Sequence, residues 1–487
     1  MERRWFARFA AIAAGLALAS AGAPAAAQTA TLELKRLGAS RSLGSFDFFA
    51  TAMTAEDVAA SVVPQSVGMP IREGEDTFLE YEFSEHVTRE PEYVSEHPLR
   101  DSVRLGDHRY CLALDSRPGE EEYSVLYFDR DRNGDLTDDA VIEAKRHKSP
   151  GFLIFGGGDV GYEFPLVELE IVVEGRPMPY ALGVVTRRHG EEETTYVSAS
   201  LSAAVYREGE IAIAGRRHRL VLVDMNSNGR FDDRIPAEAL EGEEDDAPLF
   251  LLGAGGDALL VDPEGARPWD LFDPASDLAG RCHPAGGRIV LDGAFHELAV
   301  SPTGAEVKIT PYAGALGRLQ NSMGPWRAWI RSGKDRFLVA AGSDGAATVP
   351  AGEWRLLSYT VDLTAQEAAK AGPPPKRSFL SSLGALFGGE PGPPTTLVSA
   401  RAGKDVAPVR VGGGEEAALP FGPPYRGVVT AQRGRRAGGV RLSLQIVGAA
   451  GEVVSDLRVG GNRPKEPTFV ITDPAGAVVK RGSFEYG

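Results

Sequence analysis

The chain has 487 residues, too many for a single hydrophobic core, so we expect about two to four domains. Its formal net charge of −16 argues against nucleic acid as a partner. The 58 glycines and 33 prolines supply many turns, which favours strands over helices. The sequence therefore predicts a mainly β, multi-domain protein with antiparallel sheets, β-sandwiches and few short helices.

The first residues predict an export signal. Arg3 and Arg4 open it, a weakly apolar run covers about 9–21, and Ala25–Ala27 offers a small-residue cleavage site. The arginine pair also resembles the twin-arginine pattern, so the ordinary and the twin-arginine export routes both stay open. We expect residues 1–27 to be cleaved and the mature protein to be periplasmic or secreted, with no membrane span after cleavage.

Residues 28–91 form an irregular N-terminal region with few clear signals. Thr54 and the acids after it have the pattern of a helix start, and we expect a strand at Asp76–Phe83. From 92 to 250 strand signals dominate. Val103–Leu114 has the pattern of a hairpin that turns at Gly106–Asp107, and Phe164–Val173 alternates apolar and acidic residues.

The region 92–250 also contains an internal duplication. The apolar segments Tyr123–Phe128 and Leu220–Val223 each lead into a similar polar loop. We therefore expect the two loops to occupy equivalent corners of one duplicated β domain.

After an irregular connector at 251–285, strand signals return in a predicted domain at 286–370, which begins with a hairpin at Ile289–Val300. Within it, Gly345–Leu356 resembles prealbumin-like or carboxypeptidase-regulatory-like β-sandwich modules. The resemblance implies a structural or binding role rather than a catalytic one. Residues 371–395, rich in Pro and Gly, predict a disordered insertion or linker. In 396–487 the alternation over Val440–Ile446 predicts an immunoglobulin-like β domain.

The most specific chemical pattern is the first polar loop. Asp129, Asp131 and Asn133 place oxygen-bearing side chains at positions 1, 3 and 5, and Gly134 takes the sharp turn at position 6. This spacing predicts a loop that wraps a calcium ion. The carbonyl of Asp135 is the expected fourth ligand, Thr137 is a candidate to act through water, and Asp138 or Asp139 completes the shell.

The second loop repeats the pattern about ninety residues later. Its predicted calcium ligands are Asp224, Asn226, Asn228, the carbonyl of Arg230, and Asp232. Because an amide replaces one early carboxylate, we expect the second loop to bind calcium more weakly than the first.

Both loops resemble those of EF-hands and dockerins, and also the strand-flanked loops of integrin-type propellers and thrombospondin repeats. A sensor EF-hand has helices on both sides and a bidentate Glu at position 12. Here strands lead in, and Ala140 and Ile235 stand at position 12. The resemblance therefore implies a static structural calcium site. The competing interpretation is a metal-free Asn-Gly turn at a strand end.

Other chemical signals are weak. Gly156–Gly161 matches a dinucleotide-binding pattern, but a strand-like segment follows where a helix is required. Cys111 and Cys282 form a disulfide or lie separately in the interior, and both possibilities stay open. Three tryptophans suit a sugar-binding face, although core packing is the favoured interpretation: Trp326, Trp329 and Trp354. No arrangement of residues predicts a catalytic centre.

The leading hypothesis is a non-enzymatic, secreted or periplasmic, calcium-binding β protein with a structural, adhesion or interaction role. Its partner would be a protein or a polysaccharide at the cell surface. One alternative is a secreted hydrolase of glycans or peptides with structural calcium. A second alternative is a carbohydrate-binding module protein.

Overall fold

The computed structural model describes residues 26–37, 65–72, 80–120, 122–148, 160–189, 196–234, 256–263, 281–333, 335–366, 395–403, 406–433 and 440–486. Four predicted features lie outside these ranges: the export signal before Ala26, the helix start at Thr54, most of the Gly156–Gly161 pattern, and the linker at 371–394.

The described residues are mainly β, with 59% in strands and 2% in helices, which confirms the predicted fold class. A short helix, α3 (Glu80–His86), occupies part of the segment where a strand was expected at Asp76–Phe83, so that prediction is wrong from Glu80 onward. The helix buries Phe83, which packs against Leu136 in a small cluster. This tertiary contact overrides a weak local preference for extended backbone.

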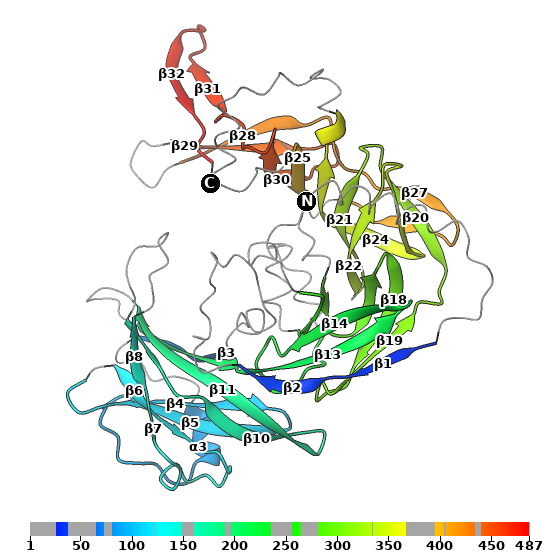
Figure 1. The fold of residues 1–487 in the computed structure, drawn as a ribbon. Coiled ribbons are helices and arrows are strands. Elements are labelled where there is room, and N and C mark those ends of the chain that lie inside the picture. Colours follow the sequence, from blue (N-terminus) through cyan, green and yellow to red (C-terminus); the bar gives the residue numbers. More distant parts are fainter. Residues whose placement is uncertain are drawn as a thin grey trace, which may run out of the picture. The chain divides into compact units, whose positions relative to one another are not determined.

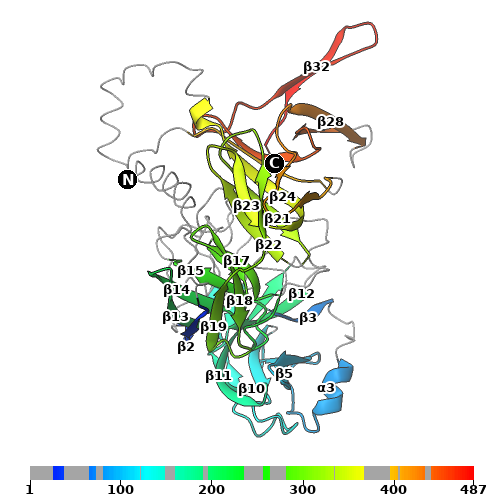
Figure 2. The same ribbon diagram turned by 90° about the vertical axis from the view of Figure 1, so that its right-hand side faces the viewer.

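The chain divides into two compact units. The loop-bearing unit comprises Ala26–Ile289 and His296–Pro311, and it contains both predicted calcium loops. The second unit comprises the described residues of Val290–Phe295 and Tyr312–Gly487. Figures 1 and 2 show that strands dominate each unit.

The loop-bearing unit is built from antiparallel sheets joined by short turns. One sheet has the order β4-β5-β6-β7: β4 (Leu99–Leu105), β5 (His108–Ser116), β6 (Tyr123–Phe128) and β7 (Ile142–Glu143). A second has the order β16-β15-β14-β13-β2: β16 (Cys282–Pro284), β15 (Ala258–Val261), β14 (Arg216–Val223), β13 (Val205–Ile213) and β2 (Glu33–Arg36).

A six-stranded sheet has the order β3-β12-β11-β9-β8, with β10 also paired to β11. Its strands are β3 (Gln65–Arg72), β12 (Tyr196–Ala203), β11 (Arg176–His189), β9 (Val160–Glu163), β8 (Lys145–Lys148) and β10 (Val167–Val173). A four-stranded sheet has the order β1-β19-β18-β17: β1 (Gln28–Thr31), β19 (Glu306–Pro311), β18 (Ala294–Val300) and β17 (Gly287–Leu291).

Three predicted features of these sheets are confirmed. β4 and β5 form the expected hairpin around Gly106–Asp107, and β17 pairs with β18 as predicted. β10 buries alternate residues, because its apolar side chains face the core and its acidic ones face solvent. Gly106 has a φ of +58°, and a Cβ there would lie 2.2 Å from the carbonyl oxygen of Val172. The β4–β5 turn therefore requires glycine for both conformation and space.

In the second unit, one sheet continues across the predicted linker. β24 pairs with β25, and β25 pairs with β30, so residues on both sides of 371–394 share one sheet. The order is β22-β21-β24-β25-β30-β29-β28, with β26 also paired to β24: β22 (Asp335–Ala341), β21 (Trp326–Ser332), β24 (Gly352–Asp362), β25 (Leu397–Arg401), β30 (Val453–Arg458), β29 (Val440–Val447), β28 (Arg426–Arg433) and β26 (Val409–Val411).

The second unit has two smaller sheets. One has the order β23-β20-β27: β23 (Ala346–Pro350), β20 (Leu316–Gln320) and β27 (Glu416–Ala418). The other is the hairpin of β31 (Thr468–Thr472) and β32 (Val478–Ser483). The core holds all three candidate sugar-binding tryptophans, Trp326, Trp329 and Trp354, each no more than 2% exposed. Core packing is confirmed for these tryptophans, and they do not form a platform on the surface.

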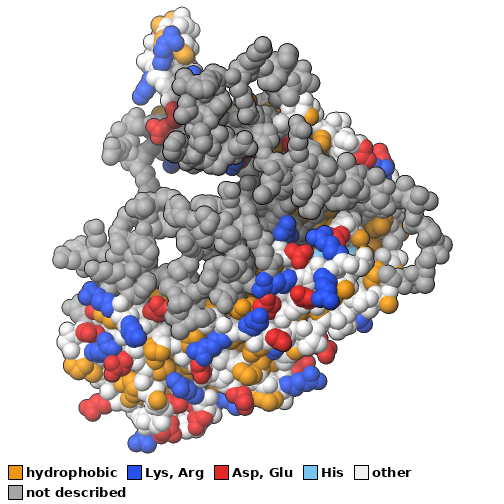
Figure 3. Space-filling model, viewed as in Figure 1, with side chains coloured by type: hydrophobic (Ala, Val, Ile, Leu, Met, Phe, Trp, Pro, Cys, Tyr) orange, Lys and Arg blue, Asp and Glu red, His pale blue; other side chains and the backbone are white. Residues whose placement is uncertain are grey.

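The surface of the described residues is mixed in charge. Lysine, arginine and carboxylate side chains are interspersed over the loop-bearing unit on the face shown in Figure 3. Apolar side chains are exposed in the C-terminal strands, and Val479 of β32 is 67% exposed. Within the described ranges, no helix is long and apolar enough to cross a membrane.

The same substitution at a buried and at an exposed valine should separate core packing from surface effects in the second unit. Val349→Ala in β23 removes two fully buried methyl groups, and we expect it to cost about 2 kcal/mol of unfolding free energy. Val479→Ala should change that free energy by less than about 0.5 kcal/mol. Urea unfolding of both variants measures the difference, and equal costs would contradict this assignment of the core.

Candidate metal centre

The first loop begins at the end of a central strand. β6 pairs with β5, and the backbone N–H of Asp129 donates to the carbonyl of Cys111 at 2.9 Å, which continues the ladder by one bond. At position 8, Leu136 is fully buried, and it packs in a cluster with Phe83 and Cys111. The loop is therefore fixed at its first residue by hydrogen bonding and at its eighth by burial of an apolar side chain.

The backbone of the first loop is held in a tight wrap. Arg132 and Gly134 have positive φ angles of 63° and 78°, and a Cβ on Gly134 would lie 2.5 Å from the carbonyl oxygen of His86 at the end of α3. The backbone N–H groups of Thr88 and Arg89 both donate to the carbonyl of Gly134. The segment after α3 therefore clamps the sixth position of the loop from outside.

Three carboxylates meet inside this wrap. Asp129, Asp131 and Asp139 place one oxygen each within 4.8 Å of one another. Calcium binds oxygens at about 2.3–2.6 Å, so two ligands on opposite sides of one ion lie about 5 Å apart. The three oxygens can therefore all reach a single ion.

The electrostatics of this cluster favour a cation. Burial raises the pKa of Asp129 and of Asp139, and neighbouring carboxylates raise the pKa of both further. The backbone N–H groups of Asn133 and Gly134 donate to Asp129 at 3.1 Å, which partly offsets the effect on its pKa. A cation at the centre would relieve the repulsion among the carboxylates.

The remaining predicted ligands of the first loop lie around this cluster. The side-chain amide of Asn133 donates to Asp138 at 2.9 Å and to Asp131 at 3.2 Å. The carboxylate of Asp135 accepts hydrogen bonds from Thr137 and Arg89, and the bonds from Thr137 lower its pKa most. This agrees with a role for Asp135 through its carbonyl, because its carboxylate is already engaged.

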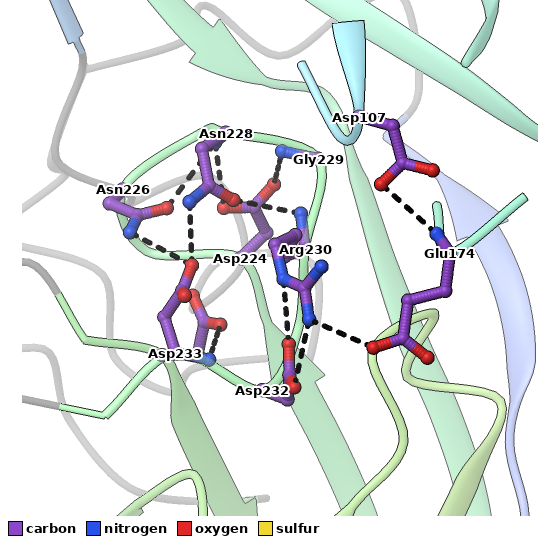
Figure 4. Close-up of polar contacts among 10 residues, drawn as sticks. Asp107, Glu174, Asp224, Asn226, Asn228, Gly229, Arg230, Asp232 and Asp233 are labelled. Atoms are coloured by element: carbon purple, nitrogen blue, oxygen red, sulfur yellow. Dashed lines mark hydrogen bonds and ion pairs between the residues drawn. The ribbon is translucent and has the colours of Figure 1, made fainter. Parts of the chain in front are cut away.

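The second loop repeats the hydrogen-bond network of the first. The N–H of Asn228 donates to Asp224, the N–H of Gly229 donates to Asp224, and the N–H of Arg230 donates to Asn228. The side-chain amide of Asn228 donates to Asp233 at 2.6 Å, as that of Asn133 does to Asp138. Figure 4 shows this arrangement, with Asn226 and Asn228 directed toward Asp233. The two loops thus share a wrap as well as a sequence pattern.

The second loop lies deeper than the first. Asp224 is fully buried, and the hydroxyl of Tyr180 donates to it at 2.6 Å. Asp257, which is 1% exposed, accepts hydrogen bonds from the N–H groups of Met225 and Asp233. Burial raises the pKa of Asp224 to about 7 and raises that of Asp257 well above its usual range.

The structure places the predicted residues of the second loop unequally. Asp224, Asn226 and Asn228 line its inner side, whereas the carboxylate of Asp232 pairs with the guanidinium of Arg230 at 3.0 Å. Sequence analysis missed two acids. Asp233 is equivalent in position to Asp138, so alignment of the two loops would have found it. Asp257 lies 24 residues further along the chain than Asp233, and no sequence pattern connects it to the loop.

The cysteines do not form a catalytic or disulfide pair. Cys111 and Cys282 are both buried and free, in different sheets of the loop-bearing unit. Burial raises the pKa of Cys111 to about 11 and that of Cys282 to about 12, which keeps both as unreactive thiols at neutral pH.

Comparisons with known proteins give no match from which a role for the site could be transferred. No protein family, curated protein or solved structure matches the chain.

The ligand atoms in the first loop can be compared with the atoms that different metal ions prefer. The three side chains gathered in the first loop offer carboxylate oxygens, which calcium prefers, and no thiolate or imidazole of the kind that zinc prefers. The residues present therefore fit a hard, oxygen-binding cation.

Stability of the metal-free protein should depend on pH through Asp224. Its pKa of about 7 in the folded state exceeds the ordinary value of 3.8, so between about pH 4 and 7 the folded state holds a proton that the unfolded state releases. This group therefore stabilises the fold fully below pH 4, and its contribution is lost as the pH rises through 7. The loss over the whole window is at most about 4 kcal/mol.

In metal-free buffer we expect a lower urea midpoint at pH 8 than at pH 5. The variant Asp224→Asn keeps the shape of the side chain without its titration, so it should reduce this dependence. A midpoint of the wild-type protein that rises between pH 5 and pH 8 would argue against a protonated Asp224 in the folded state.

Proposed function

We propose that this chain is an exported, non-enzymatic β protein whose loop-bearing unit is stabilised by calcium. The observation that carries the proposal is the meeting of Asp129, Asp131 and Asp139 within 4.8 Å inside a wrapped loop at a strand end. The second loop supports it, because an independent segment of the chain adopts the same hydrogen-bonded wrap around buried acids.

The role proposed for calcium is structural. Strands lead into both loops, so an ion would fix a corner between β elements rather than change the angle between two helices. Extracellular calcium modules bind at about 10⁻⁴–10⁻³ M, which suits a protein that meets millimolar calcium outside the cytoplasm. The export signal predicted from the sequence of residues 1–27 also supports this location.

Within this proposal the chain serves in structure, adhesion or another interaction at the cell surface. The buried tryptophans of the second unit remove the main sequence argument for a carbohydrate-binding face. The two described cysteines are buried and protonated, so they supply no reactive thiol. The buried tryptophans favour the leading hypothesis over the carbohydrate-binding alternative.

Calcium should raise the melting temperature of the mature protein. At a tenfold excess of calcium over Kd, one site adds about 1.4 kcal/mol of unfolding free energy. For a unit of this size that corresponds to roughly 3–6 °C. Thermal unfolding with calcium and with chelator, at matched ionic strength, measures the shift. An identical melt in both conditions, with no calcium in the purified protein by elemental analysis, would refute the proposal.

Two neighbouring aspartates provide a test of the ligand set in the first loop. Asp139 belongs to the three-carboxylate cluster, whereas Asp138 accepts a hydrogen bond from the side chain of Asn133. We expect Asp139→Asn to weaken calcium binding by about tenfold or more and Asp138→Asn to weaken it less. Calorimetric titration of the two variants measures both losses, and the reverse order would assign the ligand to Asp138.

A further inference from the structure

Strand β5 and the turn that precedes it contact both loops, and this placement links the two proposed calcium sites. The second loop lies against the turn that starts β5, and the first loop is bonded to the middle of the same strand. This inference rests on the proposed function. We propose that calcium binding at one loop increases the calcium affinity of the other loop, and that β5 is the element that connects them.

The contact at the start of β5 is made by backbone atoms. The N–H of Gly106, in the β4–β5 turn, donates to the carbonyl of Asn228 at 2.7 Å. A Cβ on the adjacent Gly229 would lie 3.0 Å from the nitrogen of Gly106 and 2.5 Å from Ile171. The path of the second loop therefore determines where the turn can lie, with no side chain between them.

A neighbouring turn braces this contact. The carboxylate of Asp107 accepts hydrogen bonds from the N–H groups of Glu174 and Gly175 in the β10–β11 turn. Arg230 of the second loop lies 3.6 Å from the carboxylate of Glu174. Figure 4 shows Asp107, Glu174 and Arg230 in this chain of contacts. The loop and the two turns thus form one polar junction.

The contacts to the first loop begin four residues after Gly106. The guanidinium of Arg132 lies over the ring of Tyr110 at 5.6 Å, and the carbonyl of Cys111 accepts the N–H of Asp129. Leu136 packs in the same cluster as Cys111. Residues at positions 1, 4 and 8 of the first loop therefore depend on the course of β5.

The sign of the coupling follows from these contacts. Without an ion, repulsion among the acids loosens each loop, and ordering the loop consumes part of the binding free energy. An ion in the second loop fixes the turn at Gly106 and so orders β5 before the first loop binds. Less conformational entropy is then lost when calcium binds at the first loop, so the binding free energies of the two loops are positively coupled. Coupling of binding free energies is reciprocal, so either loop can act on the other.

A thermodynamic cycle tests the proposal. The variant Asn226→Ala/Asp233→Ala should bind calcium only at the first loop, and the variant Asp131→Ala/Asp139→Ala should bind calcium only at the second. Calorimetric titration of the wild-type mature chain with calcium should give two sites whose product of association constants exceeds the product from the two single-loop variants. We expect an excess of about fivefold or more.

A glycine pair provides the matched control for the route through β5. Gly106→Ala should abolish the excess, because the new Cβ would displace the turn from Val172. Gly119→Ala makes the same substitution at a φ of +80°, but its new Cβ would have no heavy atom within 4 Å. This variant should therefore preserve the excess in the product of association constants. If Gly106→Ala fails to fold, Asp107→Ala removes the brace between the turns and should reduce the excess.

The possible failures are distinct. If the wild-type chain binds two ions and its product of association constants equals the product from the two single-loop variants, the coupling is overturned and the proposed function stays intact. A single ion bound by the wild-type chain would also overturn the coupling. No calcium bound by the wild-type chain would overturn the proposed function itself. An excess that survives Gly106→Ala would overturn the route through β5.

Discussion

The loop-bearing unit depends on how it compensates the buried carboxylate of Asp224. Two loop N–H groups and the hydroxyl of Tyr180 donate to this group, so its hydrogen bonding is well satisfied. Its negative charge is not compensated, because the nearby carboxylate of Asp233 raises the pKa of both Asp224 and Asp257 further. Burial of an ionised carboxylate without a counter-charge costs several kcal/mol. Either a proton or a cation can offset this cost in the folded state.

The two loops place the same wrap in different surroundings. Asp131 of the first loop is exposed, so an ion there would exchange readily with solvent. The second loop lies against two turns and contacts β11 and β12 through Tyr180 and Ser227, so its ion would be part of a junction. Loss of the ion would therefore have unequal consequences. It would loosen a corner in the first loop, whereas in the second it would loosen contacts among three sheets.

Features whose residues lie close together in the chain could be predicted from the sequence. The spacing of Asp129, Asp131 and Asn133 predicted a wrapped loop, and the structure places their polar groups together. The hairpin at Gly106 was predictable for the same reason, because its turn residues are adjacent in the chain. Asp257 was not predictable, because it reaches the second loop only through the pairing of β14 with β15. Likewise, sequence analysis separated 286–370 from 396–487, whereas β24 and β25 join strands from both in one sheet.

These non-local contacts limit what an ion bound in either loop could do. A sensor loop converts binding into movement because its position-12 carboxylate pulls an exiting helix toward the ion. Here Ala140 and Ile235 stand at that position, and each loop is instead held from outside, by Arg89 in one case and by Gly106 in the other. An ion in such a loop would stiffen contacts that already exist. Under the proposed function, the physical output of binding would then be stability and order transmitted through β5.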